Sequence, residues 1–248
     1  MTKNDFAALH KAGAPLILFN CWDAGSAKAI ASSGASAIAT GSLALAGAQG
    51  FDDGEGIPFE VLLKTVRQIA SVIDLPLSVD IETGFADSPD DIASNAAALI
   101  EAGAIGCNLE DRLLPSGGLR DPAGQAARIS AASDAGLFVN ARTDLFLAPL
   151  MAGEDPNRIE LVDAAAERAA IYGKAGAGCL FAPGLSDPSL IASLCERVNM
   201  PVNVMRLDGM VSNSELAKLG VARISYGPGP WRAAMEAVAD NAKAALSK

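Results

Sequence analysis

Three acidic residues follow two short apolar segments near the middle of the chain. Asp80 and Glu82 stand two residues apart at the end of one segment, and Glu110 ends the next. Residues two apart on a strand point the same way, so these carboxylates are expected to gather. Crowded carboxylates repel each other unless a cation offsets their charge, and oxygen ligands favour Mg²⁺ or Mn²⁺. Alternatively, some of them cap helices or pair with Arg112 and Arg142.

Arg142 ends a further apolar segment, within Asn-Ala-Arg-Thr-Asp. Its planar guanidinium matches a carboxylate, so we predict that it anchors the carboxylate of a substrate. The alternative is a buried arginine that pairs with Glu110 or Asp144.

An earlier segment ends in Thr40, Gly41 and Ser42. Its backbone N–H groups and a hydroxyl could bind a second carboxylate of the substrate. The same residues could instead form a tight exit from a strand, and spacing alone does not decide between the two.

Eight short apolar runs recur along the chain and alternate with Ala-rich segments of helical pattern. Runs flanked by Gly, Pro or Asp are typical of strands buried on both faces. We predict strands at Leu16–Asn20, Ala37–Gly41, Leu77–Ile81, Ile105–Glu110, Leu137–Ala141, Cys179–Ala182, Val202–Met205 and Ala222–Tyr226. Helices are predicted at Ser26–Ser33, Phe59–Ile73, Pro89–Ala102, Gly124–Ala135, Arg158–Ala175, Pro188–Val198, Ser212–Leu219 and Trp231–Ser247.

Eight strand–helix units in 248 residues fit an α/β fold of the (β/α)₈ TIM barrel type, formed by one domain over residues 1–248. An open doubly wound sheet is the alternative. It would need G-x-G-x-x-G after the first strand, where the chain reads NCWDAGSAK. The active site of a TIM barrel lies at the carboxyl ends of its strands, where the polar residues above fall.

Composition excludes several classes of protein. Lys and Arg number 19 against 29 Asp and Glu, and this net charge of −10 argues against nucleic acid or an anionic membrane as partner. The four cysteines are scattered and there is a single histidine, which argues against a zinc site of Cys and His. The chain has neither the apolar run of a secretion signal nor one long enough to span a membrane, so we expect a cytoplasmic protein.

Five segments in order along the chain resemble those of the isocitrate lyase/phosphoenolpyruvate phosphonomutase superfamily. They read NCWDAGSAKAI, ATGSLALAG, SVDIETGF, NLEDRLLP and NARTD. In that superfamily the segment matching SVDIETGF is usually D-x-D-T-G-[FY], and its two acids help to hold Mg²⁺. The matching residues here are Asp80 and Glu82, with Glu in place of the second Asp.

The resemblance implies roles for further residues. Glu110 matches the Glu of the superfamily's Glu-Asp pair and joins the predicted metal ligands. The superfamily has an Asp in the loop after the second strand, and this Asp matches Asp53, with the adjacent Asp52 as the alternative. The substrate carboxylate is held by the segment that matches Thr40, Gly41 and Ser42 and by Arg142, while Asn203 matches a polar position that faces the pocket.

One segment departs from the superfamily. Its lyases carry K-[KR]-C-G-H in the loop after the fourth strand, where this chain reads DRLLPSGGLRDP. Its phosphonomutases place Lys and Asn in that loop, at positions that match Ser116 and Gly118. Superfamily members also form tetramers, often by exchanging a C-terminal helix, so we expect a homo-oligomer (dimer or tetramer).

These observations predict a Mg²⁺-dependent lyase that cleaves a carbon–carbon bond in a small 2-oxo or 2-hydroxy carboxylate through an enolate, with an oxaloacetate-like or methylisocitrate-like substrate. Asp53, Glu110 and Arg142 are the predicted catalytic residues. Two alternatives stay open. One is phosphonopyruvate/phosphoenolpyruvate mutase or hydrolase activity, and the other is a 2-oxo acid binding protein with little catalysis.

Overall fold

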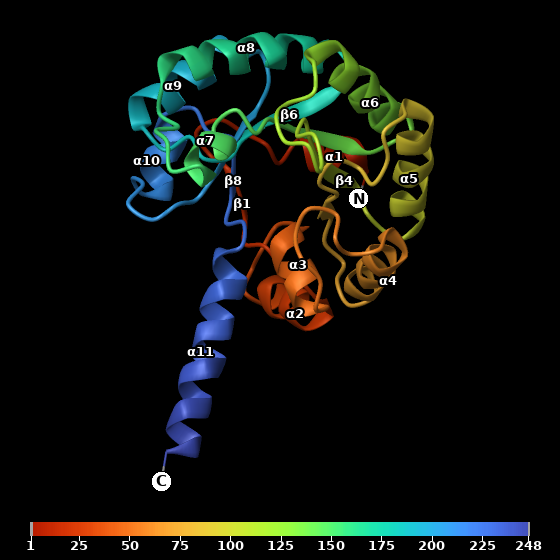
Figure 1. The fold of residues 1–248 in the computed structure, drawn as a ribbon, viewed down its shortest axis with the longest axis vertical. Coiled ribbons are helices and arrows are strands. Elements are labelled where there is room, and N and C mark those ends of the chain that lie inside the picture. The colour runs from red at the N-terminus through yellow and green to blue at the C-terminus, as the bar shows by residue number, and fades with distance from the viewer. Residues whose placement is uncertain (1, 248) are drawn as a thin grey trace.

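Eight parallel strands close into a barrel in the computed structural model, which describes residues 2–247 (Figure 1). Each strand from β2 to β8 pairs with the next, β8 pairs with β1, and a bridge between Cys21 and Thr40 joins the first two strands. The strands are β1 (Leu16–Leu18), β2 (Ile38–Ala39), β3 (Leu77–Asp80), β4 (Gly106–Glu110), β5 (Phe138–Arg142), β6 (Ala177–Ala182), β7 (Val202–Met205) and β8 (Arg223–Ser225). The predicted (β/α)₈ barrel is confirmed.

Eleven helices lie among the described residues, mostly on the outside of the barrel (Figure 1). They are α1 (Lys3–Ala7), α2 (Ala24–Ser32), α3 (Ser42–Ala48), α4 (Phe59–Ala70), α5 (Pro89–Glu101), α6 (Pro122–Asp134), α7 (Leu147–Met151), α8 (Ile159–Lys174), α9 (Pro188–Arg197), α10 (Asn213–Lys218) and α11 (Gly229–Leu246). The short helices α1, α3 and α7 were not predicted from the sequence, because five to seven residues carry too little periodicity to detect.

The predicted helix starts at two prolines are confirmed. Ser88 accepts a hydrogen bond from the N–H of Asp91, and the side chain of Asp187 accepts two from the first turn of α9. Each proline stands at the first helical position, where no N–H is needed.

The strands end earlier than predicted at several places. β1 ends at Leu18 rather than Asn20, and β8 spans three residues rather than five. The predicted strand Leu77–Ile81 ends at Asp80, because Glu82 adopts a left-handed backbone with φ of 50°. Residues beyond the last ladder pair turn away into the loops that form the barrel mouth.

Side chains alternate between the barrel interior and the helices, as expected for strands buried on both faces. On β4, Cys107 and Leu109 join the large core beneath the helices. A second, smaller core lies inside the barrel, where Phe6 of α1 packs with Leu16, Leu18, Ala37, Ala39, Phe138 and Cys179. The polar residues of the interior therefore lie nearer the other end, where the strands end.

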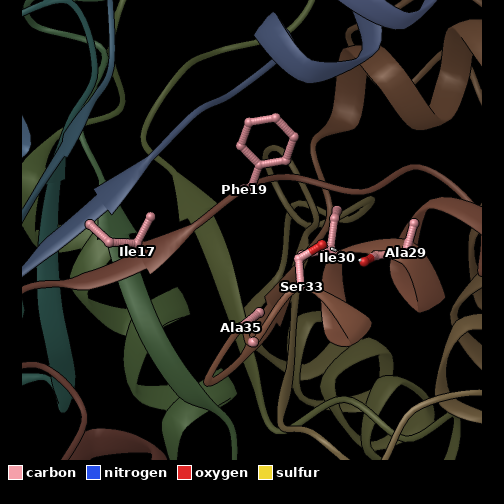
Figure 2. A pocket seen from close by; sticks show the side chains of 7 residues that line it. Ile17, Phe19, Ala29, Ile30, Ser33 and Ala35 are labelled. Atoms are coloured by element: carbon pink, nitrogen blue, oxygen red, sulfur yellow. Dashed lines mark hydrogen bonds between the residues drawn. The ribbon is translucent and has the colours of Figure 1, made fainter.

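Helix α11 projects away from the barrel instead of packing over β8 and β1 (Figure 1). Pro230 is its only buried residue. Ile17 of β1 and Phe19, the residue after this strand, are 38% and 46% exposed. Figure 2 shows the groove beside β1, which Ile17 and Phe19 line together with Ile30 of α2. Among residues 2–247 no helix has the length and apolar character needed to cross a membrane.

Candidate active site

Asp80 ends β3 at the barrel mouth and is 9% exposed. Its N–H donates to Thr40 Oγ1 (2.9 Å), and its Oδ1 accepts the N–H of Glu82 (3.2 Å). The second contact means that Glu82 reaches the site through a left-handed turn rather than by the strand alternation that we expected. The two acids are nevertheless neighbours.

The loop between β2 and α4 brings further acids to this corner. Glu82 Oε2 accepts the N–H of Glu55 at 2.7 Å. Burial, together with the negative charges of Asp53 and Asp80, raises the pKa of Glu82 to about 8. Of the two candidates in this loop, Asp53 is therefore the one whose charge reaches the site.

Arg142 lies across from these acids and holds two others. Its Nη1 is 2.8 Å from Glu110 Oε2, while Nε and Nη2 donate to the two oxygens of Asp144 at 2.7 and 3.0 Å. The pairing alternative from the sequence is thus realised. Each terminal nitrogen of a guanidinium carries two N–H groups, so one on Nη1 and one on Nη2 stay available to a substrate oxygen.

Negative charge exceeds positive charge in this buried space. Burial raises the pKa of Glu110 well above its usual range, against the opposing charge of Arg142 and with the help of Asp144 and Asp80. The pKa of Asp80 is also raised, again chiefly by burial. One arginine cannot offset this number of carboxylates, so the site favours a further cation or protons.

The donor chemistry of the site fits a hard divalent ion. Within residues 2–247 no group of three Cys, His, Asp or Glu side chains is gathered so that it could hold a metal ion, so Asp80, Glu82 and Glu110 are not a preformed ligand set. One oxygen of Glu82 accepts the N–H of Glu55, and one oxygen of Glu110 faces Arg142. Mg²⁺ commonly uses one or two carboxylates and keeps several waters, so the oxygens that stay free on Asp80, Glu82 and Glu110 suit it.

The remaining predicted substrate residues border the same mouth. The carbonyl of Thr40 accepts a hydrogen bond from the side-chain amide of Asn20, and its hydroxyl oxygen accepts the N–H of Asp80. Gly41 precedes α3. The N–H of Ser42 contributes to lowering the pKa of Asp80, which places it beside that carboxylate. Asn203 is fully buried and its amide exchanges hydrogen bonds with Ser225.

Comparison with known proteins identifies the family. The model of the family described as phosphoenolpyruvate phosphomutase matches residues 6–246. The chain belongs to this family. The resemblance seen in the sequence is thereby confirmed, and the acids and Arg142 lie at the end of the barrel where such an enzyme would work.

Three relatives illustrate the family. A solved structure of a protein provisionally named a phosphonomutase, from Burkholderia cenocepacia J2315, is 46% identical with a TM-score of 0.93, over 98% of this chain and 99% of that one. An uncharacterized protein of Mycobacterium tuberculosis is 35% identical over 96% of this chain and 88% of its own length. The 2-methylisocitrate lyase of Escherichia coli (strain K12) is 30% identical over 76% of this chain and 65% of its own length.

This member of the phosphoenolpyruvate phosphomutase family folds its loop after β4 upon itself. Arg112 bridges to Leu119, and the N–H of Leu113 donates to Gly118 at 3.0 Å. Gly117 and Gly118 have φ of 76° and 81°, values that favour glycine. The loop contains no Cys, Lys or His.

The sequence did not predict the buried network around Asp111, which holds Asp144, the partner of Arg142. Asp111 is fully buried; its Oδ1 accepts the N–H of Asp144 at 3.0 Å, and its Oδ2 accepts from Tyr172 (2.9 Å) and Arg168 (3.1 Å). Asp111 could have been found from its position next to Glu110 in the sequence. No nearby pattern indicated its partners Arg168 and Tyr172 on α8, which lie 57 and 61 residues from it in the sequence.

Proposed function

We propose that this chain is a Mg²⁺-dependent lyase that cleaves a carbon–carbon bond in a small 2-oxo or 2-hydroxy carboxylate through an enolate. The carrying observation is the excess of buried carboxylates around Arg142, at the carboxyl ends of adjacent strands. The 2-methylisocitrate lyase relative supports the lyase class.

Asp80, Glu82 and Glu110 would hold the ion. When bound, Mg²⁺ supplies a positive charge that stabilises the enolate formed as the bond breaks. Arg142 binds the substrate carboxylate through the N–H groups that Asp144 leaves free, and the Asp144 pair fixes the plane of its guanidinium.

The proton would be managed by Glu110 or Asp53. Burial raises the pKa of Glu110 and so favours its protonated form, and its Oε1 is the oxygen that does not face Arg142. Asp53 is exposed at the mouth, so it can exchange a proton with solvent. Thr40, Gly41, Ser42 and Asn203 would border the remainder of the substrate.

A metal-dependent turnover assay tests this function. The chain is stripped with a chelator and supplied with Mg²⁺ or Mn²⁺, together with oxaloacetate, 2-methylisocitrate and related acids; phosphonopyruvate tests the mutase or hydrolase alternative. Asp80→Ala and Glu82→Ala should abolish turnover, whereas Glu60→Ala, an exposed acid on α4, should behave as the wild type. Full activity in Asp80→Ala would refute the metal role. Tight binding of 2-oxo acids with no product would favour a binding protein.

We further propose that a second copy of the chain covers the groove beside β1. Helix α11 carries an apolar stripe at helical spacing, Trp231, Met235 and Val238, and the last of these is 62% exposed. The first turn of α11 borders the same surface, where Pro230 and Ala234 lie near Phe19. Exchange of α11 between two copies would bury both the stripe and the groove.

Light scattering after size-exclusion chromatography tests the assembly. Val238→Asp should shift the chain toward monomer, because it places a charge in the stripe. Asn241→Asp adds the same charge at a polar, exposed position and should leave the molar mass unchanged. A monomeric wild type would refute the assembly without affecting the proposed chemistry.

A further inference from the structure

Two loops at the barrel mouth are joined by one side chain that has no role in the function proposed above. Glu55 lies in the loop between β2 and α4 and is half-buried. Its Oε1 accepts the hydroxyl of Thr83 at 2.5 Å and the N–H of Phe85 at 2.9 Å, both in the loop after β3. In the opposite direction, its own N–H donates to Glu82. Glu55 therefore contacts the loop after β3 with both its side chain and its backbone.

The backbone at this junction is strained. Glu55, Glu82 and Phe85 have φ of 60°, 50° and 55°, and they are the only residues other than glycine with positive φ in the described chain. Such conformations cost about 1–3 kcal/mol each and persist only where surrounding contacts determine them. Because these three residues are also linked by hydrogen bonds, their conformations indicate a functional constraint rather than an ordinary turn.

The outer side of the loop after β3 is held independently of Glu55. Arg128 of α6, which is 1% exposed, donates to the carbonyls of Thr83, Ala86 and Asp87, and Asn95 donates to that of Gly84. These contacts fix the carbonyl oxygens, whereas Glu55 takes the N–H and hydroxyl on the inner side. Loss of the Glu55 carboxylate would thus free the loops from each other without dismantling the barrel.

We infer that Glu55 is a positioning residue, which locks the loop carrying Asp53 onto the end of β3 and aims Glu82 at the shared site. Its N–H donates to Oε2 of Glu82, so that Oε1 is the oxygen of this carboxylate that would be left for a cation. The inference rests on the proposed function. Outer groups that orient metal ligands typically change metal affinity 10- to 100-fold when they are removed.

Mg²⁺ titration calorimetry on the purified full chain, without substrate, gives the first readout. Glu55→Ala should weaken Mg²⁺ binding at least about tenfold. Glu55→Gln keeps a carbonyl oxygen of the same reach and should stay within a few-fold of the wild type, and Glu60→Ala is the matched control. Kinetics at saturating Mg²⁺ should show a lower kcat with nearly unchanged KM. Wild-type Mg²⁺ affinity in Glu55→Ala would overturn the inference.

Amide hydrogen exchange gives a readout that needs no metal. Exchange at Phe85 and Glu55 should accelerate in Glu55→Ala and not in Glu55→Gln; unchanged exchange in Glu55→Ala would overturn the inference. If Glu55→Ala does not fold, Thr83→Val removes only the hydroxyl donor, and Thr83→Ser restores it as the control. A wild type that binds no Mg²⁺ would overturn the proposed function, and exchange alone would then decide whether Glu55 joins the loops.

Discussion

Acidification is expected to destabilise this protein through its single histidine, His10, which lies at the closed end of the barrel. The imidazole is 7% exposed, stacks on Phe138 with ring centroids 4.6 Å apart, and places Nδ1 3.1 Å from the carbonyl of Phe6. Its Nε2 has no hydrogen-bond partner within the described residues. Burial, with a smaller contribution from the charge of Arg223, lowers the pKa of His10 to about 3.

The direction of the pH effect on stability follows from which state, folded or unfolded, binds the proton. Between the unfolded pKa of 6.5 and the folded pKa of about 3, the unfolded chain takes up a proton and the folded chain does not. The contribution of His10 to stability is therefore complete above pH 6.5 and falls as the pH decreases. At about 1.4 kcal/mol per pH unit, lowering the pH from roughly 7.5 to 5.0 removes about 2 kcal/mol from the free energy of unfolding.

Urea unfolding at both pH values, with His10→Phe as reference, measures this loss. The buried acids act in the opposite direction, since a raised pKa such as that of Glu82 makes the folded state bind the additional proton. The wild type should lose about 2 kcal/mol more than His10→Phe over the same interval. Because the chain has one histidine, NMR of its ring protons reports the pKa directly. A ring that titrates near pH 6.5 in the folded protein would refute the reasoning.

Three further outcomes are expected. Arg142→Met should lower the free energy of unfolding in urea by about 3–5 kcal/mol, because it leaves Glu110 and Asp144 buried without a cation. Adding Glu110→Gln should recover part of the loss, and additive effects of the two substitutions would contradict the pairing. Tyr172→Phe should cost about 1–3 kcal/mol, because Asp111 loses a buried donor, and a neutral result would count against that network. Burial raises the thiol pKa of Cys21, Cys107 and Cys179 to about 12, so a disulfide reagent near pH 8 should label them only after unfolding; rapid labelling of the native chain would contradict their burial.

The barrel was predictable because its information is local. Each strand is a short apolar run, and caps such as Ser88 and Asp187 mark where helices begin. The placing of polar residues at the ends of strands then located the candidate site, since all parallel strands of a barrel end on the same side. Asp80, Glu110 and Arg142 lie together for this reason, and Glu110 pairs with Arg142 directly across the ladder.

The parts that sequence could not predict depend on contacts between distant residues. The Glu55 contacts join positions 27 to 30 residues apart, and the link from Asp111 to Tyr172 spans 61. Such hydrogen bonds leave no periodicity and no local motif. Strand alternation was also the wrong reason for placing Glu82, because its left-handed backbone ends the strand before it. Likewise, no pattern within α11 predicted that this helix projects away from the barrel.

The two arginines near the centre of the barrel differ in their surroundings, and this difference favours Arg142 over Arg223 as the proposed anchor of a substrate. Both are almost fully enclosed, but Arg142 lies between two carboxylates at the mouth, where a third anion can approach its free N–H groups. Arg223 lies deeper, donates only to Asn108, and has no carboxylate within ion-pair distance among the described residues. Burial accordingly lowers the pKa of Arg223 to about 10, whereas carboxylates hold that of Arg142 well above its usual value. The proposed binding of a substrate anion requires acids that keep the guanidinium charged and oriented, and Arg142 has two such acids at the ends of β4 and β5.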